Sequence, residues 1–415
     1  MVRLPAFLHD GKEIMKGKIR KKLLTRELAA VYVSFVLFVI LLVIPTGYED
    51  AVIYQGTDRC AAEVLETDES MIIDTGLVKS GEQSCRVRLL GGRFKGQETD
   101  AFNMLNGSLE NDKLFVVGDK AQVVISYQGD EIISVNMIDH YRIPWEIALA
   151  VMFILALILV AGKTGIRAIL SFSITVLMIW KVLVPMYLNG YHPVVTGIII
   201  TGVLTVVIIS LVYGFERRTG AAVCGAMSGL IVTAVLGVIF TDVLKIHGAI
   251  MPYSESLLYS GYADLNLTRI FMASIFIGAS GAVIDLSVDI TSAVWEVVCK
   301  KPDIGWKEAT KSGMNVGRAA MGTMTTTLLL AYSGGYVTLM MVFMAQGTPL
   351  YNIFNYKYIA SEILDTIVGS MGLVSVAPLT ALCAGWLLTR GRVPLHDTEK
   401  SGNIVAAAEQ NTGID

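Results

Sequence analysis

Two aspartates, Asp285 and Asp289, stand four residues apart in the otherwise largely apolar segment GASGAVIDLSVDITSAVWE. Residues at this spacing share one face of a helix, so both carboxyl groups are expected to project from the same side. A charged aspartate at the centre of a bilayer costs about 2.5 to 3.5 kcal/mol on insertion scales, so such residues usually face a helix bundle, pair, or lie on a proton or ion path. Structural pairing, or a place at a helix end, is the alternative.

The next apolar segment, GMNVGRAAMGTMTTTLLLAYSGG, supplies candidate partners for these carboxyl groups. Its threonines begin roughly 8 Å beyond Arg318 and end roughly 14 Å beyond it, at the rise of a helix. If the two segments are antiparallel neighbours, Arg318 approaches Asp289 and the threonine hydroxyls approach Asp285. Such hydroxyls also bond to their own helix backbone, which is the competing expectation. The predicted intramembrane polar cluster comprises Asp285, Asp289, Arg318, Thr323, Thr325, Thr326 and Thr327.

The composition places these segments in a membrane. The chain has 415 residues, of which 53% are hydrophobic and only 17% charged, with a mean hydropathy of +0.59, well above that of a soluble domain. Its net charge of −3, without a strongly basic region, argues against nucleic acid as a partner. Neither a metal-ligand spacing nor a nucleophile–base pair occurs, so no metal, cofactor, catalytic residue or enzymatic activity is expected.

About eight apolar runs are long enough to cross a bilayer. Threading them alternately places every basic cluster on one side, which predicts that both termini are cytoplasmic. The predicted organisation is a basic N-terminus (1–27), a first transmembrane helix (28–45), an external domain (48–142), a seven-helix membrane domain (145–390) and a cytoplasmic tail (391–415). The runs are Leu28 to Ile44, Ile147 to Ala161, Ala168 to Leu188, Val194 to Phe215, Ala221 to Thr241, Ile270 to Val288, Ala319 to Ala345 and Ile367 to Leu388.

The segment from Tyr48 to Arg142 has a different character. It is polar and punctuated by glycines, and its runs CRVRLL, AQVVISY and EIISVNMI are typical of strands. The predicted fold is therefore an all-α membrane bundle with a small extracellular β-rich domain inserted after the first helix, in the form of a five- or six-stranded barrel. Cys60 and Cys85 lie in this domain, where either a disulfide or two reduced, buried cysteines would be consistent with the sequence.

Small residues recur at every fourth position between Ala221 and Gly237, which predicts a helix face that lets another helix pack closely. The face comprises Ala221, Gly225, Gly229, Thr233 and Gly237. Further along, Glu362 and Asp365 precede the last apolar run, and we interpret them as solvated residues at a helix start.

The stretches GASGAVIDLSVDITSAVWE, GRAAMGTMTTTLLLAYSGG and GSMGLVSVAPLTAL resemble the YibE/F-like family of bacterial membrane proteins. The family tends to carry an acidic residue and an asparagine where this chain has Ala319 and Thr326, so no role that needs a carboxylate at Ala319 carries over. The order of elements is more loosely similar to the SecD/SecF and RND permease architecture. That similarity implies coupling of proton flow to movement of external domains. It also implies a homo-oligomer or a paralogous membrane partner, because only one half of the doubled layout is present.

These observations predict a proton- or cation-coupled transport or export component of the bacterial plasma membrane. Asp285 would accept the ion, Asp289 and Arg318 would tune it, and the threonines would line its route. The alternative is a non-transporting envelope scaffold or assembly factor that binds a partner through its external domain. In both cases the lipid bilayer is a partner, and the substrate is unknown.

Overall fold

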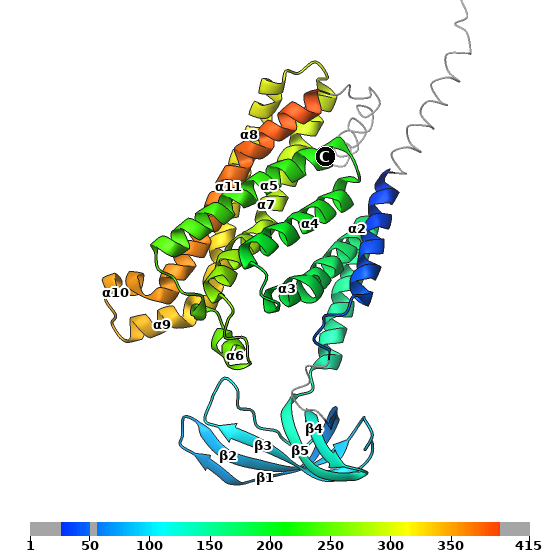
Figure 1. Cartoon of the computed structure of the whole chain (residues 1–415), viewed down its shortest axis with the longest axis vertical. Helices are drawn as coiled ribbons and strands as arrows, with labels where there is room; N and C mark the ends of the chain where they lie inside the picture. Colours follow the sequence, from blue (N-terminus) through cyan, green and yellow to red (C-terminus); the bar gives the residue numbers. More distant parts are fainter. Residues whose placement is uncertain (1–25, 50–55, 391–415) are drawn as a thin grey trace, which may run out of the picture. The chain divides into compact units, whose positions relative to one another are not determined.

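The computed structural model describes residues 26–49 and 56–390, and it divides into two compact units. One unit, Tyr48–Val160, contains a β-barrel, and the other, Met1–Gly47 with Ala161–Asp415, is helical in its described residues (Figure 1). The β-rich domain expected from the sequence is therefore present.

The barrel has five strands, β1 (Thr57–Asp74), β2 (Lys79–Leu89), β3 (Glu98–Asn106), β4 (Lys120–Gln128) and β5 (Glu131–His140). Their order is β1-β2-β3-β5-β4, and β4 pairs with β1, so the sheet closes on itself. Every pairing is antiparallel except that of β3 with β5, a Greek-key arrangement. Closure leaves no free edge strand, and alternate residues such as Cys85, Val87 and Leu89 fill the interior.

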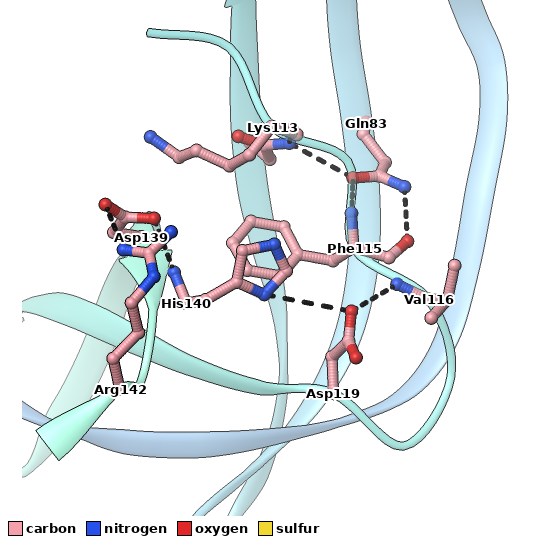
Figure 2. A network of polar contacts seen from close by, with 9 residues as sticks. Gln83, Lys113, Phe115, Val116, Asp119, Asp139, His140 and Arg142 are labelled. Carbon is pink, nitrogen blue, oxygen red and sulfur yellow. Dashed lines mark hydrogen bonds and ion pairs between the residues drawn. The ribbon is translucent and has the colours of Figure 1, made fainter. Parts of the chain in front are cut away.

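A buried amide pair fixes the long β3–β4 connection. Gln83 Nε2 donates to the Phe115 carbonyl at 2.8 Å, and Gln83 Oε1 accepts from the Phe115 N–H at 3.0 Å (Figure 2). Asn103 Nδ2 donates to Gln83 Oε1 at 3.1 Å and to the Lys113 carbonyl at 2.6 Å. Both amides are almost fully buried, so these bonds satisfy groups that would otherwise be costly inside a core.

The end of β5 is tied to the same connection. The His140 ring lies 4.6 Å from the Phe115 ring, and His140 Nδ1 is 3.9 Å from Asp119 Oδ2 (Figure 2). One residue earlier, Asp139 pairs with Arg142 at 2.8 Å, and the hydrogen bond from this guanidinium lowers the pKa of the Asp139 carboxyl. These contacts order the residues that lead directly into helix α2.

Cys60 and Cys85 are free thiols, so the disulfide left open by the sequence is not formed. Cys85 lies opposite Thr67 on β1, and Cys60 is seven residues away along that strand, opposite Val123. At about 3.3 Å per residue this separation far exceeds the span of roughly 7 Å that a disulfide bridges. Burial, followed by the charge of Glu69, raises the pKa of Cys85 to about 11.

The helical elements of the described residues begin with the N-terminal helix Arg26–Val43 (blue in Figure 1). Counted as continuous helical stretches, seven of the described segments, this helix included, are long and apolar enough to cross a membrane. The elements that follow the N-terminal helix are, in chain order, α2 (Ile143–Met178), the π-helix η1 (Ile179–Leu183), α3 (Val184–Leu188), α4 (Pro193–Tyr213), α5 (Arg217–Val243), η2 (Gly248–Ile250), α6 (Ser254–Tyr259), α7 (Leu267–Lys300), α8 (Trp306–Ser333), η3 (Gly334–Tyr336), α9 (Val337–Ala345), α10 (Leu350–Asn355) and α11 (Lys357–Thr389).

The count of seven treats as one helix two of the about eight spans that the sequence predicts. The runs predicted as two separate spans belong to one helical stretch, Ile143–Leu188, of 46 residues. Gly162, with φ 54° and ψ −125°, leaves the helical conformation and divides this stretch into two helices at a kink. The kink falls between the two runs predicted from the sequence, and by helix rise the segments before and after it are roughly 28 Å and 39 Å long, each enough to cross a hydrocarbon core of about 30 Å.

The part of this stretch after Gly162 lies beside the N-terminal helix. Arg167 pairs with Glu27 at 3.1 Å, and Lys181 Nζ donates to the Ile44 carbonyl at 2.9 Å. Because both contacts follow chain order, the two segments run in the same direction. Lys181 thereby satisfies a carbonyl near the end of the N-terminal helix.

Helices α5, α7 and α11 form the centre of the helical unit, and small residues let them approach closely. The α5 face named above is buried and faces α11 and α7. A methyl group added at Gly229 would lie 2.7 Å from Val376 Cβ, and one at Gly237 would lie 3.4 Å from Ile275 Cδ1. A methyl group added at Gly225 would clash with Thr380 of α11, and one added at Gly372 of α11 would clash with Thr233 of α5.

Candidate functional site

Helices α7 and α8 are antiparallel neighbours, and their register brings the predicted polar residues to one level. A methyl group added at Gly317 would lie 3.0 Å from Ile290 Cδ1, and one at Gly278 would lie 2.8 Å from the Tyr332 hydroxyl. Asp285 lies between these two contacts on α7. It is therefore level with the part of α8 that contains the four threonines.

The rotation of α7 about its axis, however, keeps the predicted cluster apart. Leu286 and Ile290 face the core, and the side of the helix that carries Asp285 and Asp289 is exposed. Arg318 is exposed as well, and no ion pair or hydrogen bond joins it to Asp289 in the described part of the chain. Asp289 and Arg318 thus share a depth without forming an ion pair, and Asp285 lies one turn before Asp289 on α7, level with the threonines.

The threonine hydroxyls bond to their own helix. Thr323 donates to the Ala320 carbonyl at 3.0 Å, Thr325 to Met321 at 2.9 Å, and Thr327 to the Thr323 carbonyl at 3.0 Å. The Thr326 bond to Gly322 is longer, at 3.5 Å. The threonines thus bond to their own helix backbone, as the alternative to a polar cluster predicted, and none of the hydroxyls donates to Asp285.

Asp289 instead lies within electrostatic reach of Tyr213 at the end of α4. The Tyr213 hydroxyl is 2.6 Å from both the Val288 carbonyl and Ser292 Oγ, so it fastens α4 to α7. Arg218, paired with Glu216 at 2.8 Å, lies 5.2 Å from the Tyr213 ring centre.

A second polar group was not predicted. On α11, one carboxyl oxygen each of Glu362 and Asp365 and the Thr366 hydroxyl are buried without a hydrogen-bond partner among the described residues. Both acids act electrostatically on the Tyr332 and Tyr336 hydroxyls, and Tyr336 lies within hydrogen-bonding reach of Glu362. We call these five residues the carboxyl–tyrosine cluster.

The interpretation of the two acids as solvated residues at a helix start is wrong. Helix α11 begins at Lys357, so Glu362 and Asp365 lie in its second and third turns. Asp365 also shares a face with Gly369 and Gly372, both of which are buried against neighbouring helices. The i, i+4, i+7 spacing of one aspartate with two glycines was the signal in the sequence that could have placed this carboxyl inside the bundle.

In the described residues there is no group of three or more His, Cys, Asp or Glu side chains that could hold a metal ion. Each of the two polar groups contains a pair of acids on a long apolar helix, with Tyr213 near Asp289 in one and with Tyr332 and Tyr336 near both acids in the other. Such an arrangement can bind or exchange a proton or a single cation.

Long apolar helices with ionisable residues along them, and a barrel inserted in the sequence after the first, define a multi-helix membrane protein. The sequence profile described as YibE/F-like protein matches residues 149–390, more than half of the chain. The chain therefore belongs to the YibE/F-like family, as its motifs indicated, and the match includes both polar groups. Comparison with curated proteins and with solved structures gives no match. The looser similarity to SecD/SecF and RND permeases stays a prediction.

Proposed function

We propose that the protein is a proton- or cation-coupled component of transport or export in the bacterial plasma membrane, and that the carboxyl–tyrosine cluster takes the ion. The observation that carries the proposal is the burial of carboxyl oxygens of Glu362 and Asp365 without a hydrogen-bond partner. This pair replaces Asp285 as the proposed ion site, because the Asp285 side of α7 is exposed.

The physical argument concerns unsatisfied charge. A buried carboxylate without donors is strongly destabilised, and it is relieved either by gaining a proton or by binding a cation. The neighbouring tyrosine hydroxyls are neutral and can donate a hydrogen bond or offer a lone pair to a cation. Two acids three residues apart can therefore hold one proton or one monovalent cation between them.

The position of the cluster supports coupling of the ion to helix movement. Asp365 is one turn before Gly369, where a methyl group would lie 3.2 Å from Leu328 of α8 and 3.4 Å from Ala279 of α7. A change of charge at Asp365 thus occurs where three helices meet. Because such packing leaves little room, loss or gain of the ion would change how α11 sits against α7 and α8.

The proposed orientation has both termini in the cytoplasm, with the basic α7–α8 connection also on that side. The carboxyl–tyrosine cluster then lies towards the opposite, external side of the bundle, where ions driven by a bacterial gradient enter.

The test is ion uptake by proteoliposomes under an imposed membrane potential, read with an enclosed pH indicator for protons and with labelled sodium or potassium for cations. We expect uptake by the wild type, its loss in Asp365→Asn, and a reduction in Glu362→Gln. Asp264→Asn, an exposed loop carboxyl, is the matched control and should behave as the wild type. Unchanged uptake in Asp365→Asn refutes the site, and absence of all uptake by the wild type refutes coupling.

A scaffold function is the second candidate, and one observation favours it. In the β1–β2 hairpin the exposed fractions of Met71, Ile73 and Leu77 are 71%, 66% and 78%. Met71 of β1 and Met104 of β3 lie on either side of Glu82 of β2, which is the strand partner of both. Adjacent exposed apolar residues on a folded domain are typical of a protein-binding surface. A photo-crosslinker at Ile73, compared with one at the exposed polar position Lys95, should then capture one dominant envelope protein from intact cells.

A further inference from the structure

One exposed side of α7 lacks the large apolar side chains that helices usually present to lipid. Every exposed residue between Ser274 and Glu296 is small or acidic, and none is a large apolar residue. The helices around it differ, since α4 exposes Val195 and Ile199 and α5 exposes Ile231. The α7 stripe comprises Ser274, Gly278, Gly281, Asp285, Asp289, Ser292 and Glu296.

The spacing of the α7 stripe is that of a helix-packing seam. Its members follow one another at intervals of three and four residues, which keeps them on one side of the helix for roughly 33 Å, the thickness of a bilayer core. Within the chain, Gly278 lies against the Tyr332 hydroxyl and Ser292 against the Tyr213 hydroxyl, whereas nothing lies within 4 Å of a methyl group added at Gly281. A glycine in such an open position lets the backbone of another helix approach closely in lipid.

Three carboxyl groups lie on the α7 stripe, and Glu296 is paired with Lys300 at 2.9 Å. The other two, Asp285 and Asp289, would be costly against lipid but not against a protein that supplies donors.

Charge and depth indicate which protein that is. Gly317 of α8 packs on Ile290 of α7, so Arg318 and Asp289, the next residues along each helix, lie at one level. Both are exposed, and they do not pair with each other in the described chain. A two-fold axis along the membrane normal brings residues of equal depth on two copies face to face. The surface thus carries both halves of an ion pair that a second copy can complete.

We infer that the α7 stripe is a docking surface for a second copy of this chain, in which Asp289 of each copy pairs with Arg318 of the other. The inference stands apart from the proposed function, because it uses none of the residues of the carboxyl–tyrosine cluster. It also explains why α8 exposes an arginine beside a membrane helix.

Charge reversal in trans is the decisive test. Asp289→Arg alone and Arg318→Asp alone each place like charges at both contacts of a homodimer, and each should lower self-association by about tenfold or more. When the two variants are co-expressed with different tags, the mixed dimer regains both attractive pairs. We expect the mixed dimer to be retrieved by sequential purification at the wild-type level.

The inference is overturned if self-association is restored only when both substitutions are in the same chain. If Asp289 and Arg318 pair within one chain, the double variant recovers wild-type behaviour while co-expression of the single variants restores nothing. A monomeric mass for the wild type in lipid nanodiscs also overturns it.

A crosslinking measurement keeps the test independent of the folding of the charge variants. Gly281→Cys adds a side chain where nothing lies within 4 Å, and the matched control is Val235→Cys, an exposed position on α5. Both are made in a Cys224→Ser background, since Cys224 is itself exposed. Oxidation in native membranes should join two copies through Gly281→Cys and not through Val235→Cys. Equal yields from the two positions, or linkage of Gly281→Cys to a different protein, would exclude a second copy as the occupant.

Discussion

Replacing Gly229 by alanine should weaken the contact of α5 with α11. The added methyl group would lie 2.7 Å from Val376 Cβ and 2.8 Å from Val376 Cγ2, whereas apolar carbons pack at about 3.5 to 4.0 Å. The helices must therefore separate by roughly 1 Å, and overpacking of this kind costs about 1 to 3 kcal/mol. We expect a lower midpoint of thermal unfolding in detergent, followed by light scattering or by exposure of buried cysteines.

Gly220→Ala provides the matched control on the same helix, because nothing lies within 4 Å of the added methyl group. Both substitutions gain the intrinsic helix preference of alanine, up to about 1 kcal/mol, so their difference isolates the steric term. Asp365 lies on the same packed helix as Val376, so the change should also reduce ion uptake. If Gly229→Ala is as stable as Gly220→Ala, the close approach of α5 to α11 is not as described.

Three further predictions follow from local contacts. Tyr213→Phe removes hydrogen bonds to α7 and should cost about 1 to 3 kcal/mol in detergent unfolding, whereas Tyr191→Phe, at an exposed position, should cost little. Cys85, with a pKa of about 11, should be alkylated at pH 8 only after unfolding, since about one thiol in a thousand is then ionised; rapid labelling of the native protein would contradict its burial. Arg142 lowers the pKa of Asp139 below the ordinary value of 3.8. This pair therefore stabilises the barrel above pH 3.8, and its contribution is lost as the pH falls through the lowered pKa. Arg142→Ala should flatten the acid dependence of hydrogen exchange in β5, and an unchanged profile would count against the pair.

The level of each polar residue along its helix could be predicted from the sequence, whereas the direction of its side chain could not. Counting residues from Arg318 placed the threonines level with Asp285, because helix rise is nearly constant. Whether Asp285 faces the bundle depends on which neighbours cover α7. The assumption that membrane carboxyl groups face inward fails if a second chain supplies the cover.

The same distinction explains the two acids of α11. Their position before an apolar run indicated solvent. Helix α11, however, begins ten residues before that run, and one carboxyl oxygen of Asp365 is buried, one turn before Gly369. The barrel was easier to predict, since β-branched runs between glycine turns specify strands locally. Its strand order was not, because the parallel contact of β3 with β5 joins residues far apart in the chain.

Because the threonine hydroxyls of α8 donate to their own backbone, this part of the helix surface can accept hydrogen bonds but not donate them. A hydroxyl has a single proton, and the exposed Thr323, Thr326 and Thr327 direct theirs to backbone carbonyls, which leaves their oxygen atoms able to accept. This row can accept hydrogen bonds or touch a cation, but it has no proton left to give. Whatever lies along the threonines must therefore bring its own donors or positive charge, and the nearest cation on α8 is the exposed Arg318, about two turns before Thr326.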